Sequence, residues 1–169
     1  MPVWFGKKES KKTQGAHNVS EVQGGGTTAS KTYLADVDFS KGSEVALNQA
    51  MKLAGESKGK LLLVHVISTT FAFPLEVGFG DIFEALEKNA RESMRRLVQR
   101  KRLKPGQYRS ILITGLDPAQ VIVSQAKKSR ASMIIMGSQG KTGLQRFLLG
   151  SVAERTLRYA KCPVLIVKK

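Results

Sequence analysis

The chain is short of the residues that form disulfides and metal sites. It has one cysteine, Cys162, and two histidines in 169 residues, so no internal disulfide can form and nothing indicates an oxidising compartment. No pair of histidine, cysteine or carboxylate side chains has the spacing of a metal-binding motif. His65 is flanked by apolar residues in a predicted strand, which favours a place in the core. Cys162 precedes a predicted strand and is expected to be a small buried residue.

Long apolar runs and targeting signals are missing as well. The longest apolar run, around residues 61–67, is much shorter than a membrane span. The first residues lack the apolar core of a secretory signal, and residues 1–30 contain no arginine, which argues against a mitochondrial transit peptide. We therefore expect a cytoplasmic protein without a membrane span.

Acidic residues are scarce relative to basic ones. The chain has 28 Lys and Arg against 13 Asp and Glu, a net charge of +15, and residues 88–104 carry eight basic residues and one acidic residue. Such a patch can bind nucleic acid or an anionic membrane non-specifically, but a solvated helix face is the simpler interpretation. No aromatic residue lies between the basic ones, which disfavours a single-strand binding platform. Nucleic acid is therefore kept as the less favoured partner.

Residues 1–30 differ from the rest of the chain in composition. They are rich in Gly, Ser, Thr, Lys and Gln and have no apolar periodicity, which is typical of a disordered tail or linker. The apolar residues 2–5 are interpreted as part of that disordered end. The alternative is a short docking motif for an unknown protein partner. Residues 31–169 are predicted to form one folded domain.

Strand-like and helix-like patterns alternate from residue 31 onward. Helical periodicity separates the strands, a long helix is predicted at roughly 81–103, and Asp117-Pro118 is a cap and first helical residue. The alternation predicts an α/β fold with a doubly wound, flavodoxin-like parallel sheet of order 3-2-1-4-5 and helices on both faces. The five strands are predicted at residues 32–38, 61–67, 108–114, 133–136 and 163–167.

A glycine-bearing loop follows the fourth predicted strand. The strand ends at Gly137, Gly140 follows, and Gly150-Ser151 precede a helix predicted at 151–160. Ser151 is predicted as the N-cap and Glu154 as its partner in a capping box. Glycines let a phosphate approach backbone amides, and a helix N-terminus attracts anions, so the loop is a candidate oligophosphate cradle. The alternative is an ordinary turn followed by a capped helix.

Two better-known nucleotide motifs do not fit. Gly140-Lys141-Thr142 resembles the end of a Walker A loop, but Ile135 occupies the position of its first glycine, so no P-loop can form. Gly78-Phe79-Gly80 suggests a dinucleotide fingerprint, but Phe83 stands where the third glycine belongs.

The predicted topology assigns a place to Asp38. In a doubly wound sheet, ligands bind at the carboxyl ends of the strands where the strand order reverses, here between the first and fourth strands. Asp38 ends the first predicted strand and therefore faces the same crevice as Gly137. A carboxylate there can accept hydrogen bonds from ribose hydroxyls. The alternative is that Asp38 caps the following helix.

The spacing of Gly137, Gly140 and Gly150-Ser151, followed by Val152, resembles the nucleotide-binding signature of the ATP-binding branch of the universal stress protein family. The resemblance covers residues 31–169 and implies an adenine nucleotide alpha-hydrolase-like fold with ATP as ligand. It implies adenine against the backbone of Val66, and a homodimer formed through the final strand, Val164 to Val167. The implied site comprises Asp36, Asp38, Val66, Met136, Gly137, Ser138, Gly140, Lys141, Gly150, Ser151 and Val152.

The chain departs from the family pattern at several positions. Many members have proline two residues before the acidic residue, where this chain has Asp36, and many have arginine after the first glycine, where it has Ser138. Many have aspartate just before the fourth strand, where this chain has Ser132. Two carboxylates beside one nucleotide either weaken its binding or recruit Mg²⁺, and Lys141 is expected to supply the missing positive charge.

These patterns predict an ATP-binding regulatory module of the stress response with little or slow hydrolysis. No catalytic residue is assigned, because Glu154 is expected in the cap and Asp38 at the ribose. One alternative is an ATP-using enzyme of related topology, which needs a Ser-Gly-Gly loop where this chain has Ser40-Lys41-Gly42-Ser43. The other is a basic nucleic-acid-binding protein, whose binding depends on salt and not on ATP.

Overall fold

The computed structural model describes residues 30–69, 79–140 and 149–168. The predicted doubly wound sheet is confirmed: the strand order is β3-β2-β1-β4-β5, and every neighbouring pair is parallel. Except for Ser30, the tail predicted for residues 1–30 lies outside the described residues. The elements are β1 (Thr32–Asp36), α1 (Lys41–Glu56), β2 (Lys60–Ser68), α2 (Phe79–Arg100), β3 (Tyr108–Gly115), α3 (Pro118–Lys128), β4 (Met133–Gly137), α4 (Ser151–Tyr159) and β5 (Val164–Val167).

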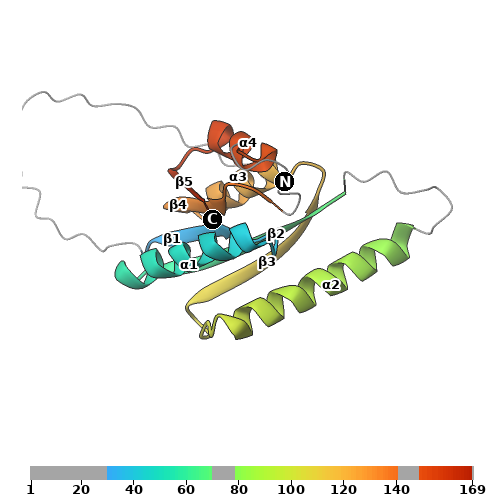
Figure 1. Ribbon diagram of the computed structural model, residues 1–169, viewed down its shortest axis with the longest axis horizontal. Helices are drawn as coiled ribbons and strands as arrows, with labels where there is room; N and C mark the ends of the chain where they lie inside the picture. Colours follow the sequence, from blue (N-terminus) through green and yellow to red (C-terminus); the bar gives the residue numbers. More distant parts are fainter. Residues whose placement is uncertain (1–29, 70–78, 141–148, 169) are drawn as a thin grey trace, which may run out of the picture.

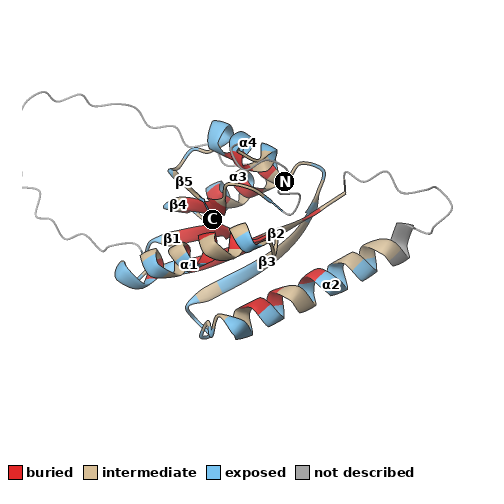
Figure 2. Ribbon diagram, viewed as in Figure 1, coloured by how far each residue is buried: buried red, intermediate tan, exposed pale blue. Residues whose placement is uncertain are grey.

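The sheet separates two apolar clusters, one on each face. Strand side chains alternate between the faces, so Tyr33 and Ala35 of the central strand β1 pack towards α1 and α2, and Leu34 packs towards α3 and α4. All three side chains are buried. Figure 1 shows the helices on the two sides of the sheet, and Figure 2 shows the buried residues gathered in the strands and on the helix faces turned towards them.

The first strand is shorter than the sequence predicts. β1 ends at Asp36, not at Asp38, because the chain turns immediately afterwards. Phe39 adopts a left-handed backbone with φ 63°, and the Asp38 side chain accepts a hydrogen bond from the Ser40 amide at 2.9 Å. Ser40 is then the N-cap of α1, its side chain accepting from the Ser43 amide. Asp38 therefore supports the cap of α1 without being the cap.

Helices α1, α2 and α3 end in the same way. In α1, the Lys58 amide donates to the Gly55 carbonyl at 3.3 Å and the Gly59 amide donates to the Ala54 carbonyl at 2.8 Å. This is the Schellman arrangement, in which the residue after the C-cap is left-handed and usually glycine. Equivalent pairs of bonds close α2 and α3. The left-handed residues are all basic: Lys58 (φ 52°), Arg102 (φ 52°) and Arg130 (φ 50°).

Two predicted helix starts have different outcomes. Asp117 caps α3 as predicted, accepting from the Ala119 amide at 3.1 Å, and its other oxygen pairs with Arg155 of α4. The predicted capping box of α4 is wrong. Gly150 is the N-cap and makes no side-chain capping bond, so Ser151 becomes the first helical residue. Glu154 is exposed and pairs with Arg158 at 3.0 Å.

Helix α2 carries the basic stretch that the sequence singles out, but carboxylates offset much of its charge. Glu92 pairs with Arg95 at 2.8 Å and Arg96 at 2.7 Å, and the hydrogen bonds from these two guanidinium groups lower the pKa of Glu92 to about 2. Arg91 pairs with Glu87 in the same helix. Arg100 and Lys101 pair with Glu44 of α1. No helix in the described ranges is both long and apolar enough to cross a membrane.

Candidate functional site

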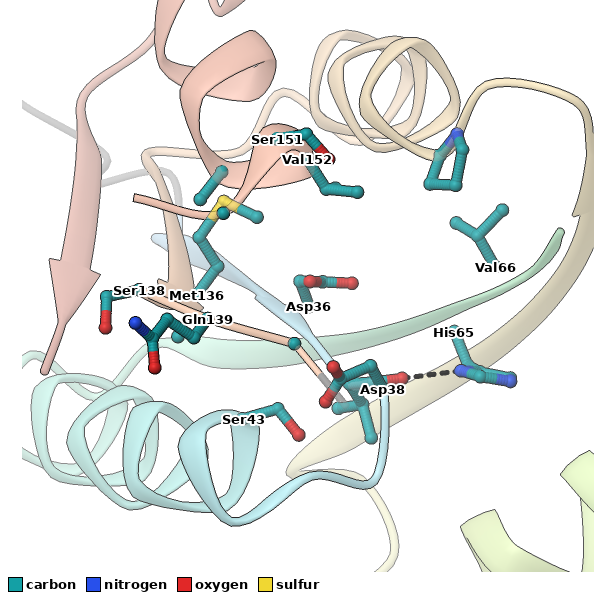
Figure 3. A pocket seen from close by; sticks show the side chains of 16 residues that line it. Asp36, Asp38, Ser43, His65, Val66, Met136, Ser138, Gln139, Ser151 and Val152 are labelled. Atoms are coloured by element: carbon teal, nitrogen blue, oxygen red, sulfur yellow. Dashed lines mark hydrogen bonds between the residues drawn. The ribbon is translucent and has the colours of Figure 1, made fainter. Parts of the chain in front are cut away.

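A cavity of about 200 Å³ lies where β1 and β4 end. Its walls come from the turn after β1, from β2, from the glycine loop after β4 and from the first turn of α4, as Figure 3 shows. Ten of the eleven predicted site residues line it, whereas Lys141 lies outside the described residues. The ten are Asp36, Asp38, Val66, Met136, Gly137, Ser138, Gly140, Gly150, Ser151 and Val152.

The pKa of Asp36, in the wall of the cavity, lies well above its ordinary value. Asp36 is the last residue of β1 and is half-buried. Burial, followed by the nearby carboxylate of Asp38, raises the pKa of Asp36 from its ordinary value of 3.8 to about 7. Desolvation and a like charge both disfavour the ionised form. Near neutral pH, therefore, protonated and ionised Asp36 coexist in the cavity wall.

Asp38 lies against the glycine loop. A Cβ added at Gly140 would come within 3.0 Å of its Oδ2 atom, and its Oδ1 atom holds the Ser40 amide. The turn after β1 and the glycine loop after β4 thus meet at one crevice, as the strand order predicts. A larger side chain at position 140 would enter the space between the loop and Asp38.

The glycines of the loop do not all serve one purpose. A Cβ at Gly137 would lie 2.9 Å from the backbone carbon of Gly42 and 3.1 Å from the Ser43 nitrogen. Real Cβ atoms essentially never make contacts as short as the first of these. Gly137 is therefore required for the close approach of β4 to the first turn of α1, whatever the cavity binds. The alternative interpretation, packing and turn formation, accounts for this part of the motif.

One amide of the predicted cradle, that of Gly150, is already engaged inside the protein, and so is the amide of the neighbouring residue Ser138. The Ser138 amide donates to the Val167 carbonyl at 2.9 Å, and the Gly150 amide donates to the Ser138 carbonyl at 2.8 Å. The predicted cradle of Gly137, Gly140, Gly150 and Ser151 must therefore be corrected at Gly150, whose amide is not available to a phosphate. What can bind an anion is the first turn of α4, where the amides of Ser151 and Val152 precede any helical acceptor and carry the positive end of the helix dipole.

Six of the lining residues are not among the predicted site residues. Among them is His65, for which the predicted core position is wrong: it is half-buried and lines the cavity. Its Nδ1 atom donates to the Val37 carbonyl at 2.6 Å, the dashed line in Figure 3, and its ring lies 4.5 Å from that of Phe39. His65 thus supports the turn after β1. The six are Val37, Ser43, His65, Pro118, Gln139 and Ala153.

The position of His65 follows from sheet register. Asp36, the last residue of β1, is paired with Val64 of β2, so His65 is the first residue of β2 beyond the end of its neighbour. A side chain at that point borders the crevice and is not enclosed by the next strand. The sequence alone does not give the register, so the apolar neighbours of His65 led to the prediction of a core position.

A second and larger hollow, of about 850 Å³, lies between α2 and β3. Charged residues of α2 and the exposed side of β3 line it, among them Glu87, Arg91 and Tyr108. It is remote from the carboxyl ends of β1 and β4, and no helix N-terminus faces it in the described part of the chain. The smaller cavity is therefore the candidate site.

Comparisons with known proteins agree with this fold over its whole length. The family model described as the universal stress protein family matches residues 30–168. Universal stress protein MJ0531 of Methanocaldococcus jannaschii is 34% identical over 141 residues, which cover 82% of this chain and 82% of that protein.

Solved structures of similar proteins have the same fold. Protein MJ0577 of Methanocaldococcus jannaschii aligns with a TM-score of 0.73 at 30% identity, covering 82% of this chain and 96% of that one. The fold is shared with a universal stress protein from Archaeoglobus fulgidus in complex with dAMP, at a TM-score of 0.58 and 24% identity over 82% of this chain and 98% of that one. From the sheet order, the match over residues 30–168 and the similarity to MJ0531, it follows that the chain belongs to the universal stress protein family.

Proposed function

We propose that this protein binds ATP in the cavity at the ends of β1 and β4 and acts as a nucleotide-dependent regulatory module of the stress response. The observation that carries the proposal is the meeting of three features in one cavity: the carboxylate of Asp38, the glycine loop and the first turn of α4. The complex of the Archaeoglobus fulgidus relative with dAMP supports an adenine nucleotide as the ligand class.

Each part of the cavity suits a different part of the nucleotide. Asp38 retains carboxylate lone pairs that can accept from ribose hydroxyls. The backbone of Val66, which lines the cavity from β2, is the proposed contact for adenine. The amides of Ser151 and Val152 would donate to phosphate oxygens, a role for which helix N-termini are well suited.

The carboxylates also fit a magnesium ion that accompanies ATP. Mg²⁺ is commonly held by one or two carboxylates together with substrate phosphates and water, and Asp36 and Asp38 both line the cavity. No group of three or more histidine, cysteine or acidic residues able to hold a metal occurs among the described residues. The ion is therefore proposed as a companion of the triphosphate, whose charge it would neutralise.

Slow turnover is part of the proposal. The titratable side chains of the described cavity wall are Asp36, Asp38 and His65. Asp38 accepts a hydrogen bond from the Ser40 amide and His65 donates one to the Val37 carbonyl. Both side chains therefore stabilise the turn after β1. Glu154, which the sequence analysis assigned to a cap, pairs with Arg158 on the exposed side of α4. A protein that binds ATP and hydrolyses it slowly can report nucleotide levels through its conformation or its partners.

Calorimetric titration with ATP and AMP in Mg²⁺ buffer tests the proposal. ATP is expected to bind at least about tenfold more tightly, because the amides at the start of α4 and the Mg²⁺ ion act on the outer phosphates. Mass spectrometry of the natively purified protein should show a co-purified adenine nucleotide. Equal affinities for the two ligands would assign the cavity to a nucleoside monophosphate, and binding of neither would remove it as a nucleotide site.

A homodimer through β5 is the second part of the proposal. β5 is an edge strand paired only with β4 in the described sheet, and its four residues, Val164–Val167, are all partly exposed. An apolar edge strand with an unpaired side is a template for pairing with another chain, and a two-fold axis would make that pairing antiparallel. Sedimentation at micromolar concentration is expected to give twice the chain mass of 18.5 kDa. A single species of the monomer mass would contradict the dimer.

A further inference from the structure

The edge of the sheet opposite the cavity is strongly basic. All five strands are parallel, so their amino-terminal ends lie together at this edge, where α1, α2 and α3 also end. Figure 1 shows the ends of α1 and α2 on the same side as the start of β3, and Figure 2 shows these ends exposed. We call this surface the basic edge and define it by six exposed basic residues: Lys31, Lys58, Lys60, Arg102, Lys104 and Arg130.

Backbone hydrogen bonds hold the entering segments side by side. The Lys60 amide donates to the Lys31 carbonyl at 2.8 Å, and the Ser132 amide donates to the Thr32 carbonyl at 2.7 Å. The chain entering β3 is joined in the same way to the start of β2. Because neighbouring strands lie about 4.8 Å apart, the starts of β3, β2, β1 and β4 bring the six cations into one continuous surface.

Acidic residues do not offset this surface. The described segments between a helix and the next strand at this edge, residues 57–59, 101–107, 129–132 and 160–163, contain no acidic residue. Glu56, at the end of α1, has its Oε1 atom 3.9 Å from Lys52 Nζ. None of the six residues of the basic edge has an ion-pair partner among the described residues. Most basic residues of α2, by contrast, have an acidic partner: Arg91, Arg95, Arg96 and Arg100. The positive charges of the basic edge are thus less neutralised by acidic partners than those of α2, although basic residues are more closely spaced in the sequence of α2.

Three of the six residues keep their charge at a conformational cost. Lys58, Arg102 and Arg130 occupy the left-handed positions of the three Schellman motifs, where glycine is the residue without strain. Cations near a helix C-terminus interact favourably with the dipole, but the last turn of α3 already provides Lys127 and Lys128 for that purpose. Strained residues that persist are found preferentially where they serve a function. The same exchange of glycine for a cation in three helices places three of the six charges at this edge.

We infer that the basic edge binds the phosphate backbone of a nucleic-acid duplex without reading its sequence. Closely spaced, unpaired cations are what backbone binding requires. A membrane-binding surface adds apolar residues for insertion. None of the six residues of the basic edge is apolar; of the exposed large hydrophobic residues of the described chain, Leu116 follows β3 at the opposite edge, and Leu157 and Tyr159 lie in the last turn of α4. Tyr159 is the one exposed aromatic residue that the described chain places near this edge, and a single ring does not supply the series of platforms on which successive unpaired bases stack. This inference does not depend on what the cavity binds.

The triple variant Lys58→Gly, Arg102→Gly and Arg130→Gly tests the inference in the full chain. Glycine relieves the left-handed positions, so the variant should be as stable as the wild type. We expect fluorescence anisotropy with a labelled 20-base-pair DNA duplex to show binding weakened at least roughly tenfold at 50 mM salt, with the slope of log K against log[salt] reduced by about 3. Saturating ATP should leave both quantities unchanged, since the cavity lies at the other edge.

The matched control, Lys88→Gln, Arg91→Gln and Arg96→Gln, removes the same charge from α2. It should reduce the salt slope by much less than the glycine variant. Equal losses in both variants would attribute binding to net charge, and an unchanged slope in the glycine variant would exclude the basic edge. If the wild type binds phosphatidylserine vesicles but not the duplex, the surface belongs to a membrane and the inference is wrong.

Discussion

The Gly140→Trp variant is expected to lose at least a hundredfold in ATP affinity, roughly 3 kcal/mol. A Cβ at this position already lies 3.0 Å from Asp38 Oδ2, so the indole must occupy the space between the glycine loop and the carboxylate. That space belongs to the proposed binding cavity of about 200 Å³. The fold should tolerate the change, because Gly140 is exposed and the nearest atom is the end of a flexible side chain.

Gly55→Trp is the matched control for this experiment. Gly55 is exposed in α1, near the helix end remote from the cavity, and a Cβ there would meet nothing within 4 Å. It should bind ATP like the wild type in calorimetric titration. Both variants should unfold at temperatures close to that of the wild type. Wild-type affinity in a folded Gly140→Trp protein would show that the glycine loop does not border the nucleotide.

The Asp36→Asn variant is expected to be more stable than the wild type at pH 8. The pKa of Asp36 is 3.8 in ordinary surroundings and about 7 in the fold, so the folded state holds the proton more tightly. Stability gained from this group is complete below pH 3.8 and is lost as the pH rises through 7. At pH 8 the ionised carboxylate therefore costs the fold roughly 2–4 kcal/mol, and asparagine removes that cost.

Urea unfolding at pH 5 and pH 8 measures this effect. The free energy of unfolding of Asp36→Asn, relative to the wild type, should rise between the two pH values by roughly 1–3 kcal/mol, because the part of the cost that arises between pH 3.8 and pH 5 is already present at the lower pH. Glu154→Gln, which removes an exposed carboxylate of α4, controls for the loss of one negative charge and should show little change. A difference between Asp36→Asn and the wild type that does not vary with pH would mean that Asp36 is not desolvated in the fold.

The fold could be predicted from the sequence because its signals are local and repeated. Buried strands such as Met133–Gly137 appear as short apolar runs, and Asp117 with Pro118 marks a helix start that the structure confirms. Boundaries were less accurate where side chains redirect the backbone. The left-handed Phe39 and the bond from the Ser40 amide to Asp38 end β1 early, and no periodic pattern encodes either.

The candidate site was predictable in outline for a different reason. A parallel sheet brings the ends of its strands to one edge, so Asp38 and Gly140 could be placed together from topology alone. What the sequence could not supply is the use of each backbone amide. The bond from the Gly150 amide to the Ser138 carbonyl moves the helix cap from Ser151 to Gly150, and such a bond depends on the closed loop. His65 was missed because its exposure depends on how far β2 extends beyond β1.

One backbone hydrogen bond links the proposed nucleotide site to the proposed dimer interface. The Ser138 amide, in the cavity wall, donates to the carbonyl of Val167 at the end of β5. If two copies associate through β5, any change in the position of that strand moves an acceptor on which the loop depends. Thermodynamic reciprocity then requires that a ligand which alters subunit association has an affinity that varies with protein concentration. A dilution series would therefore register occupancy of the cavity without any direct observation of the nucleotide.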